Sequence, residues 1–391
     1  MSLNRSSSCV LRTRLAHALG YLDYPVDATA EPYLTYIYKL HVGNGALEEW
    51  IELFIEVIGH FDATTNGTGD GESIQALIDR LVTSGYRKIF LDTQNGQAAR
   101  VEHVEDTVMY ILGSWATMLT SFVQQRNQSR RIITAYRARS GPSILVSEPY
   151  EGNVAGLIRD CVNGHESLSI KTTRLNAFTL KVLGAVEITW TQNISRHMML
   201  VNSGGQYTLE LFSLPCAFTA TTSASIGIPA ELAHEVQESY AMLFNAWSDV
   251  SLHIRLGAQF GIRRSCWCWS CSAYRYRRYS IAEFERSTSI RARGKYRAEI
   301  ERSEFDPLVV KLSENPAQHD WTPDDFPYLW PRIARLDQHL QTARPWSLWI
   351  LFRDRRDTMQ FWTFLFATVV VLLTIVQVFL GIAQVVGSFD R

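Results

Sequence analysis

Residues 361–386 have the sequence FWTFLFATVVVLLTIVQVFLGIAQVV, an apolar run of 26 residues without a charged side chain. As an α-helix that rises 1.5 Å per residue, this run would be about 39 Å long, which exceeds the roughly 30 Å of hydrocarbon in a bilayer. Only residues 387–391 follow it. We therefore expect one C-terminal transmembrane helix that anchors the chain by its tail.

The charges around this run predict its orientation. Four arginines precede it and one follows it, namely Arg344, Arg353, Arg355 and Arg356 before the run and Arg391 after it. Because the flank that is richer in arginine stays in the cytosol, residues 1–360 are expected on the cytosolic side. The sequence does not indicate which membrane is used.

Three sequons for N-glycosylation bear on the same question. They lie at Asn66, Asn127 and Asn193. In the cytosol these asparagines would stay unmodified, and the six cysteines of the chain would stay reduced. The opposite topology, with the body in a lumen, would turn all three asparagines into glycan acceptors.

Small and amide side chains recur along one side of the expected anchor helix. Thr374, Gln377, Gly381 and Gln384 follow a spacing of three or four residues, which places them on one helical face. Such a face in lipid is typical of helix–helix interfaces, and amides in hydrocarbon are costly without partners. We expect the anchor to self-associate or to pair with another membrane helix. The alternative is that Gln384 reaches the far interface and the pattern arises by chance.

The totals describe an ordinary globular body. The chain has 391 residues, of which 46% are apolar and 20% are charged, and its net charge of −1 excludes bulk attraction to nucleic acid. No secretory signal is visible at the N-terminus. Arg5, Arg12 and Arg14 without an acid before Asp23 predict a flexible basic arm, with a mitochondrial presequence as the alternative.

The first part of the body is expected to be helical. Residues 47–61 carry apolar side chains at helical spacing, and residues 73–82 do so more weakly. Residues 104–124 are more apolar, and residues 107–123 contain no charge. Because seventeen residues diluted by Thr, Ser and Gly are at the lower limit for a membrane span, we interpret this segment as a buried core helix. The alternative is a second membrane segment.

The middle of the chain changes to a period of two. Residues 186–191 alternate as a half-buried strand, and residues 197–212 predict a hairpin around Asn202-Ser-Gly-Gly-Gln. Residues 167–172 and 178–183 are expected to pair nearby as strands. A helix is expected over residues 229–246, with Pro229 in its first turn. The predicted fold class is therefore α+β, with an antiparallel sheet between helical segments, plus the C-terminal transmembrane helix.

These patterns predict five parts of the chain. They are a basic N-terminal arm (1–22), an α+β body (23–302) with a candidate sub-boundary at 127–141, a linker and juxtamembrane segment (303–360), the transmembrane helix (361–386) and a short tail (387–391). Six prolines between residues 303 and 345 favour an extended linker with one short helix around 333–340.

Three cysteines lie close together in Cys266-Trp-Cys268-Trp-Ser-Cys271. Three thiols in six residues can donate to one zinc ion, with Cys216 or His253 as the fourth ligand. The C-x-C-x-x-C spacing is not the usual zinc knuckle. S-acylation near a membrane and a buried cluster of reduced cysteines therefore stay as alternatives.

A basic stretch surrounds these cysteines. Residues 263–302 contain eleven Lys or Arg and four Glu, a local charge of +7. Because an anchored body faces the anionic leaflet, we expect this stretch to contact the membrane surface. The residues expected to make that contact are Arg263, Arg264, Arg275, Arg277 and Arg278. The alternatives are a solvated surface or an acidic partner within the chain.

Several segments together resemble a known family. They are LNAFTLK (175–181), ITWTQNISRHMML (188–200), LELFSLPCAF (209–218), CWCWSC (266–271) and LWILFRDRRDTMQFWTF (348–364). The chain is similar in these segments to a family of uncharacterised filamentous-fungal proteins with a C-terminal transmembrane segment. The resemblance covers roughly residues 165–391 and implies no activity and no catalytic residue. It implies at most an accessory role beside biosynthetic genes.

No assembled catalytic set is visible in the sequence. The phosphate-loop, zinc-protease and serine-hydrolase motifs are all absent, and the proximity of Ser195 and His197 is interpreted as incidental. We therefore expect a membrane-anchored, non-enzymatic interaction or accessory protein. The alternative is a membrane-tethered enzyme or accessory factor that acts on an apolar metabolite.

Overall fold

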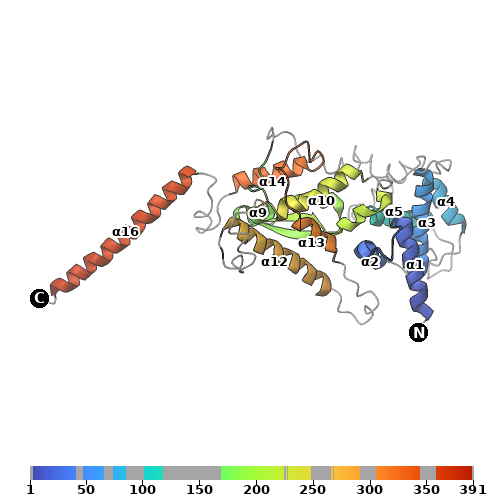
Figure 1. Cartoon of the computed structure of the whole chain (residues 1–391), viewed down its shortest axis with the longest axis horizontal. Helices are drawn as coiled ribbons and strands as arrows, with labels where there is room; N and C mark the ends of the chain where they lie inside the picture. The colour runs from blue at the N-terminus through green and yellow to red at the C-terminus, as the bar shows by residue number, and fades with distance from the viewer. Residues whose placement is uncertain are drawn as a thin grey trace.

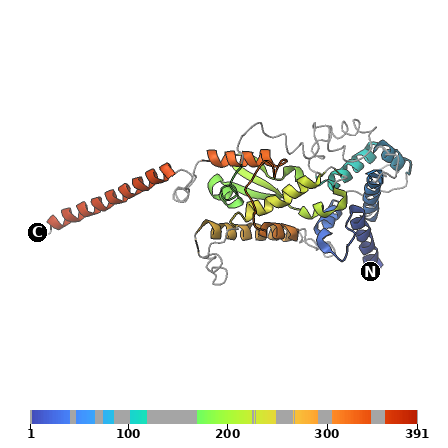
Figure 2. The same ribbon diagram turned by 45° about the horizontal axis from the view of Figure 1, so that its top comes forward.

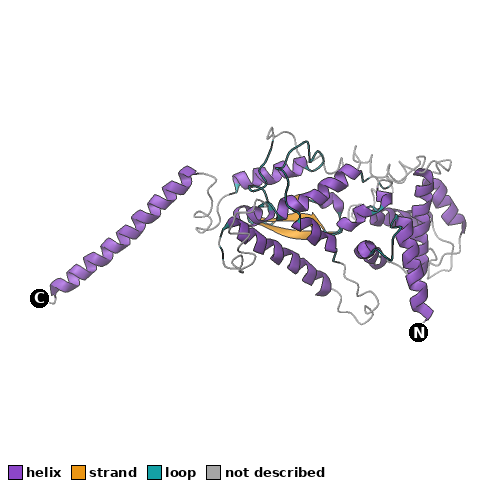
Figure 3. Ribbon diagram, in the orientation of Figure 1, coloured by secondary structure: helices purple, strands orange, loops and turns teal. Residues whose placement is uncertain are grey.

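Helices dominate the structure, and a small sheet lies among them (Figures 1 and 3). This computed structural model describes residues 3–40, 47–65, 74–84, 101–117, 169–223, 226, 228–247, 266, 268–290, 305–343 and 358–389. The predicted sub-boundary at 127–141 lies outside these residues. Buried apolar side chains from Leu11 to Leu340 form one continuous hydrophobic core.

The N-terminal part consists of helices at one end of the molecule (Figure 1). They are α1 (Leu3–Leu19), the short 3₁₀ helix η1 (Ala28–Ala30), α2 (Glu31–Lys39), α3 (Leu47–Thr65), α4 (Ile74–Ser84) and α5 (Val101–Trp115). Helix α3 confirms the helix expected over 47–61, and α4 confirms the one expected over 73–82.

The predicted N-terminal arm is instead a packed helix. In α1, Leu11, Leu15 and Leu19 recur every four residues and are buried, and the helix packs against α3. Arg12 forms an ion pair of 2.8 Å with Glu31, which fastens α1 to the start of α2. The prediction of a flexible arm was wrong because the apolar stripe of Leu11, Leu15 and Leu19 packs on the body despite the nearby arginines.

Helix α5 is a buried core helix over residues 107–115, which agrees with the expectation for residues 107–123. Val108, Ile111 and Leu112 are fully buried, and the helix ends at Trp115. Residues 118–123 lie outside the described part of the chain. Within the described residues, one helix is long and apolar enough to cross a membrane, and it lies near the C-terminus, not here.

The sheet has three strands in the order β1–β3–β2. Strands β2 (Met199–Ser203) and β3 (Gln206–Phe212) form the expected hairpin, whose turn contains Gly204 and Gly205, both with positive φ. Strand β1 (Val186–Thr191) pairs with β3 in parallel, from Val186 opposite Tyr207 to Thr191 opposite Phe212. The sheet is therefore mixed and not antiparallel. The alternation of side chains predicts a strand but does not encode the direction of its partner.

The segment expected to pair as a strand at 178–183 lies in a helix, α9 (Ala177–Gly184). Asn176 caps this helix, since its Oδ1 accepts the Thr179 N–H and its own N–H donates to the Thr179 hydroxyl, both at 3.0 Å. The capping box outweighs the strand propensity of the apolar run. At the other predicted strand, Ile170 forms an isolated bridge with Trp321.

Helix α10 (Ala230–Phe244) confirms the helix expected over 229–246 and lies beside the sheet, with Pro229 as the residue that precedes its first turn. Short 3₁₀ helices connect the elements around it, η4 (Ile194–Arg196), η5 (Pro215–Thr219) and η6 (Thr221–Ser223). Helices α12 (Trp269–Ile290) and α14 (Trp330–Thr342) lie on opposite sides of the sheet and α10 in both views (Figures 1 and 2).

Much of the predicted proline-rich linker belongs to the folded body. It contains α13 (Pro307–Glu314) and α14, and prolines occupy the first turns of both helices. Trp321 and Phe326 are fully buried in the core. The short helix expected over 333–340 is confirmed as part of α14. The prediction of a linker was wrong because the prolines begin helices here and do not keep the chain extended.

Helix α16 (Thr358–Phe389) projects away from the body (Figures 1 and 2). Its stretch Leu365–Ile382 is apolar, and none of that stretch is buried inside the protein. Such a long exposed apolar surface is unusual for a soluble domain. The C-terminal apolar helix is thus confirmed as an element that the body does not cover.

Candidate functional site

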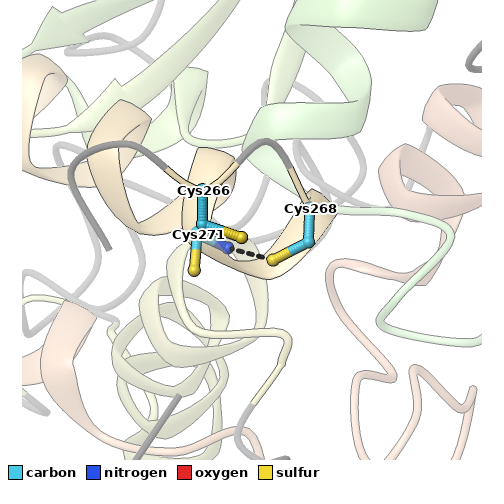
Figure 4. A group of neighbouring side chains, drawn as sticks. All are labelled: Cys266, Cys268 and Cys271. Carbon is cyan, nitrogen blue, oxygen red and sulfur yellow. Dashed lines mark hydrogen bonds between the residues drawn. The ribbon is translucent and has the colours of Figure 1, made fainter. Parts of the chain in front are cut away.

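The three clustered cysteines meet where α12 begins. Cys266 and Cys268 precede the helix, and Cys271 lies in its first turn. Their three sulfur atoms all lie within 4.8 Å of one another (Figure 4). Cys271 is buried, whereas Cys266 and Cys268 are half-buried. The local sequence therefore brings three thiols together in a group that is partly exposed.

Hydrogen bonds fix this arrangement. The Cys271 N–H donates to the Cys268 sulfur at 3.4 Å, as the dashed line in Figure 4 shows. The Arg275 guanidinium donates to the Cys266 carbonyl at 2.7 Å and to the Ser272 hydroxyl at 3.1 Å. The N–H groups of a first helical turn have no partner within their helix, and here one of them, that of Cys271, donates to the Cys268 sulfur.

Burial raises the pKa of the Cys271 thiol, and the neighbouring sulfurs of Cys268 and Cys266 raise it further. Without a bound metal, the Cys271 thiol is therefore protonated at neutral pH. A metal ion would have to displace that proton, since only the thiolate is a ligand. Three thiolates can hold a thiophilic ion such as zinc, which takes four ligands in structural sites.

Cys216 is not part of this group, which corrects its prediction as the fourth ligand. It lies in η5, where its N–H donates to the Asp306 carboxylate at 2.7 Å. Burial and the nearby Asp306 charge raise the pKa of its thiol. Cys216 thus belongs to the core between η5 and α13. His253, the other candidate, lies outside the described residues.

The arginines predicted to touch the membrane divide into different environments. Arg277 is buried and donates to the Ser313 carbonyl at 3.1 Å, so its prediction as a surface contact was wrong. Arg275 is half-buried and holds the cysteine segment. Arg278 is exposed, and its guanidinium lies 6.0 Å from the centre of the Tyr274 ring. Arg263 and Arg264 lie outside the described residues.

A groove of about 730 Å³ separates β1 from α12. All residues of β1 except Val186, from Glu187 to Thr191, line one wall. The residues of α12 that line the other wall include Tyr276, Tyr279, Glu283 and Phe284. The Trp190 and Phe284 rings stack with their centres 4.5 Å apart, so the two walls touch at this point. The groove combines aromatic, hydroxyl and carboxylate groups.

Two groups in the groove have shifted pKa values, and both shifts lead away from neutral pH. Lys181 lies 2.6 Å from Glu187, and this hydrogen bond and ion pair lower the pKa of the Glu187 carboxyl. Burial raises the pKa of Tyr276 to about 12. At neutral pH the first group is ionised and the second keeps its proton. Neither is suited to general acid–base catalysis, which works best with pKa values near the working pH.

A buried histidine–serine pair also lies beside the sheet, but its hydrogen bonds exclude a nucleophilic role. His197 Nδ1 accepts the Phe212 N–H at 3.1 Å, so Nε2 carries the ring proton and donates to Ser239 Oγ at 2.9 Å. The Ser239 hydroxyl in turn donates to the Val236 carbonyl at 2.7 Å. Burial, together with Arg332, lowers the pKa of His197 to about 3. The imidazole therefore has no free lone pair to activate Ser239.

The residues predicted as a helix–helix interface are exposed on α16. They are Thr374, Gln377, Gly381 and Gln384. The Thr374 hydroxyl donates to the Val370 carbonyl at 2.8 Å, so it is satisfied within the helix. Among the described residues, no side chain pairs with the two glutamine amides. Their interface role stays a prediction.

The sequence did not predict the groove. Strand β1 was expected, but α12 was not, because its apolar residues are few and its arginines indicate a surface. The spacing of Tyr276, Ser280, Phe284 and Ser287 along one face was the available signal.

A comparison of the chain with protein-family models, with curated proteins and with solved structures finds no match.

Proposed function

We propose that this chain is a single-pass membrane protein whose cytosolic body acts as a binding or accessory module and not as a catalyst. The observation that carries the proposal is the exposed apolar surface of α16 over Leu365–Ile382. A helix of 18 or more such residues is long enough to cross a bilayer. No part of the described body covers this apolar stretch of α16.

The distribution of arginines supports the orientation. Arg344, Arg353, Arg355 and Arg356 precede α16, whereas Arg391 alone follows it. With the body in the cytosol, the exposed Arg278 can add to the attraction of the anionic leaflet, where each such charge contributes about 1 kcal/mol. The glutamines Gln377 and Gln384 would then favour a second membrane helix as a partner, either from another copy or from another protein.

The orientation can be tested on sealed microsomes that carry the full chain. We expect protease added outside to digest the body and an endoglycosidase to cause no shift in mobility. The Asn193 side chain already accepts the Ser195 N–H at 2.9 Å and is buried, so the native fold leaves it no room for a glycan. A protected body with glycans at Asn66 or Asn127 would contradict the proposed orientation.

The groove and the histidine–serine pair support binding over catalysis. The groove holds an ionised Glu187 and a protonated Tyr276, and His197 is closed into a structural network. The alternative function, an enzyme acting on an apolar metabolite, draws on the size of the groove alone. About 730 Å³ lies within the range of small-molecule sites.

Zinc is the metal that we propose for the three-cysteine group. Cys266, Cys268 and Cys271 are already close enough to share one ion, and thiolates favour zinc and other soft ions. Bound zinc would stabilise the junction between the preceding chain and α12. It would supply no chemistry that the proposed function requires.

The zinc proposal predicts about one ion per chain in the purified protein. Replacing Cys266, Cys268 and Cys271 together with serine is expected to remove the metal and to lower the melting temperature, because metal binding and folding are coupled. The matched control is Cys9→Ser, which changes an exposed cysteine outside the group. Elemental analysis and cobalt substitution measure the metal. A folded wild-type chain without metal, or with an acyl thioester at Cys266 or Cys268, would contradict the proposal.

A further inference from the structure

Strand β1 presents a free edge to the groove. The Ser213 N–H donates to the Thr191 carbonyl at 2.8 Å, so the main-chain groups of Thr191 point toward β3. Because main-chain groups alternate in direction along a strand, those of Glu187 and Thr189 also point toward β3. The N–H and C=O groups of Ile188 and Trp190 therefore point away from the sheet. Among the described residues, none bonds to them.

This free edge lacks some of the devices that prevent further pairing, while the charged Glu187 and the neighbouring helix α12 restrict access to it. The strand VEITWT contains no proline and no lysine, and the described sheet shows no bulge at β1. Tyr276, Tyr279 and Glu283 on α12 form a wall opposite the edge. The outward main-chain donors and acceptors thus belong to a strand that lines a groove, and the groove has room for an extended ligand.

The dimensions match an extended peptide. Six residues of strand span about 20 Å, and the α12 wall from Tyr276 to Thr288 spans about 18 Å. A peptide of five or six residues in β-conformation would occupy that length. Alternate side chains of such a peptide would contact the Trp190 ring, which is half-buried and stacks on the buried Phe284 ring.

The charges of the groove favour a basic residue in that peptide. Glu187 is neutralised by Lys181 at 2.6 Å. Glu283 is exposed on the opposite wall, and no described residue forms an ion pair with it. The described residues that line the groove therefore carry one uncompensated negative charge, which favours a lysine or arginine side chain in the ligand.

We propose that this groove binds an extended peptide segment of a partner protein as a fourth strand beside β1. The main-chain groups of Ile188 and Trp190 would bond to the peptide backbone, and Glu283 would select a basic side chain. This inference deepens the proposed binding function by naming the chemical class of the partner. It does not depend on α16, since the groove lies wholly within the body.

The test uses the full chain in detergent micelles and a displayed library of random octapeptides. We expect selected peptides to be enriched in one lysine or arginine, and the best synthetic peptide to bind saturably. Replacing Glu283 with lysine is expected to reverse the preference to acidic peptides. Glu283 is exposed, so this variant tests recognition without disturbing the core.

A pair of variants at one position tests the main-chain bonds. Ile188→Pro removes an outward N–H and is tolerated on an edge strand, whereas Ile188→Ala shortens the side chain and keeps the N–H. We expect the proline variant to bind the selected peptide about tenfold more weakly than the alanine variant. A fold-change of ten corresponds to about 1.4 kcal/mol, the scale of one main-chain hydrogen bond.

A photo-crosslinker distinguishes the occupants. With p-benzoylphenylalanine in place of Tyr279, which lines the groove and is 58% exposed, we expect crosslinks to the added peptide. Crosslinks only within the chain or between two copies would overturn the proposal of a partner peptide. So would an empty selection, or equal binding by the proline and alanine variants. If the chain binds the peptide but does not insert into membranes, the proposed membrane anchor is refuted and the proposed peptide site is not.

Discussion

Arginine at both Leu372 and Val376 is expected to abolish the insertion of α16 into a bilayer. The two side chains lie four residues apart near the middle of the apolar stretch and are more than half exposed. Each arginine at the centre of a membrane helix costs about 2.5–3.5 kcal/mol in insertion, so the pair should cost about 5–7 kcal/mol. At the middle of the helix the arginine side chains lie far from either interface, so snorkelling gives them little relief.

The measurement is the fraction of chains that receive a glycan on an acceptor site appended after Arg391. Wild-type chains should carry the glycan, since their C-terminus would reach the lumen. Leu372→Ala with Val376→Ala serves as the control, because it changes the same positions and adds no charge. Equal glycosylation of the arginine variant and the wild type would refute α16 as a membrane span.

The second large effect is expected at Glu235, whose buried carboxylate joins α10 to α14. It accepts the Tyr328 N–H at 3.1 Å and the Leu329 N–H at 2.9 Å, at the residues just before α14 begins. Hydrogen bonds to a charged group contribute about 1.5–3 kcal/mol each, and alanine would leave both donors buried without an acceptor. We expect Glu235→Ala to lower the free energy of unfolding by about 3–5 kcal/mol.

Urea unfolding of the full chain in micelles measures this loss. Glu231→Ala is the matched control, because Glu231 is an exposed glutamate in the first turn of the same helix. Its loss should change the free energy of unfolding by less than about 1 kcal/mol. Glu235→Gln keeps one acceptor oxygen and should fall between the two. Similar values for Glu235→Ala and Glu231→Ala would contradict the structural role assigned to Glu235.

The sequence was sufficient for features that depend on local pattern. The apolar run at 361–386, the helix at 47–61 and the Gly204-Gly205 hairpin each carry their own periodicity or turn residues, and the structure has all three. The cysteine group was also foreseeable, because six residues cannot separate three thiols widely. In each case the determining interactions lie within one segment.

The failures share a different physical origin. The parallel pairing of β1, the burial of Arg277 and the exclusion of Cys216 from the cysteine group depend on contacts between distant segments. The prolines after residue 303 are compatible with an extended linker or with helix starts. The segment is folded because Trp321 and Phe326 are buried in the core, which is a contact with distant residues. The groove is the clearest example, because it exists only where the edge of β1 meets α12.

Extraction of membranes at alkaline pH is the most direct test of the proposed anchor. Membranes that contain the full chain are treated with sodium carbonate at high pH and floated in a density gradient. We expect the chain to float with the lipid, because the apolar surface of α16 stays in the bilayer when peripheral contacts are removed. Release of the intact, folded chain into the soluble fraction would contradict the assignment of α16 as a membrane anchor.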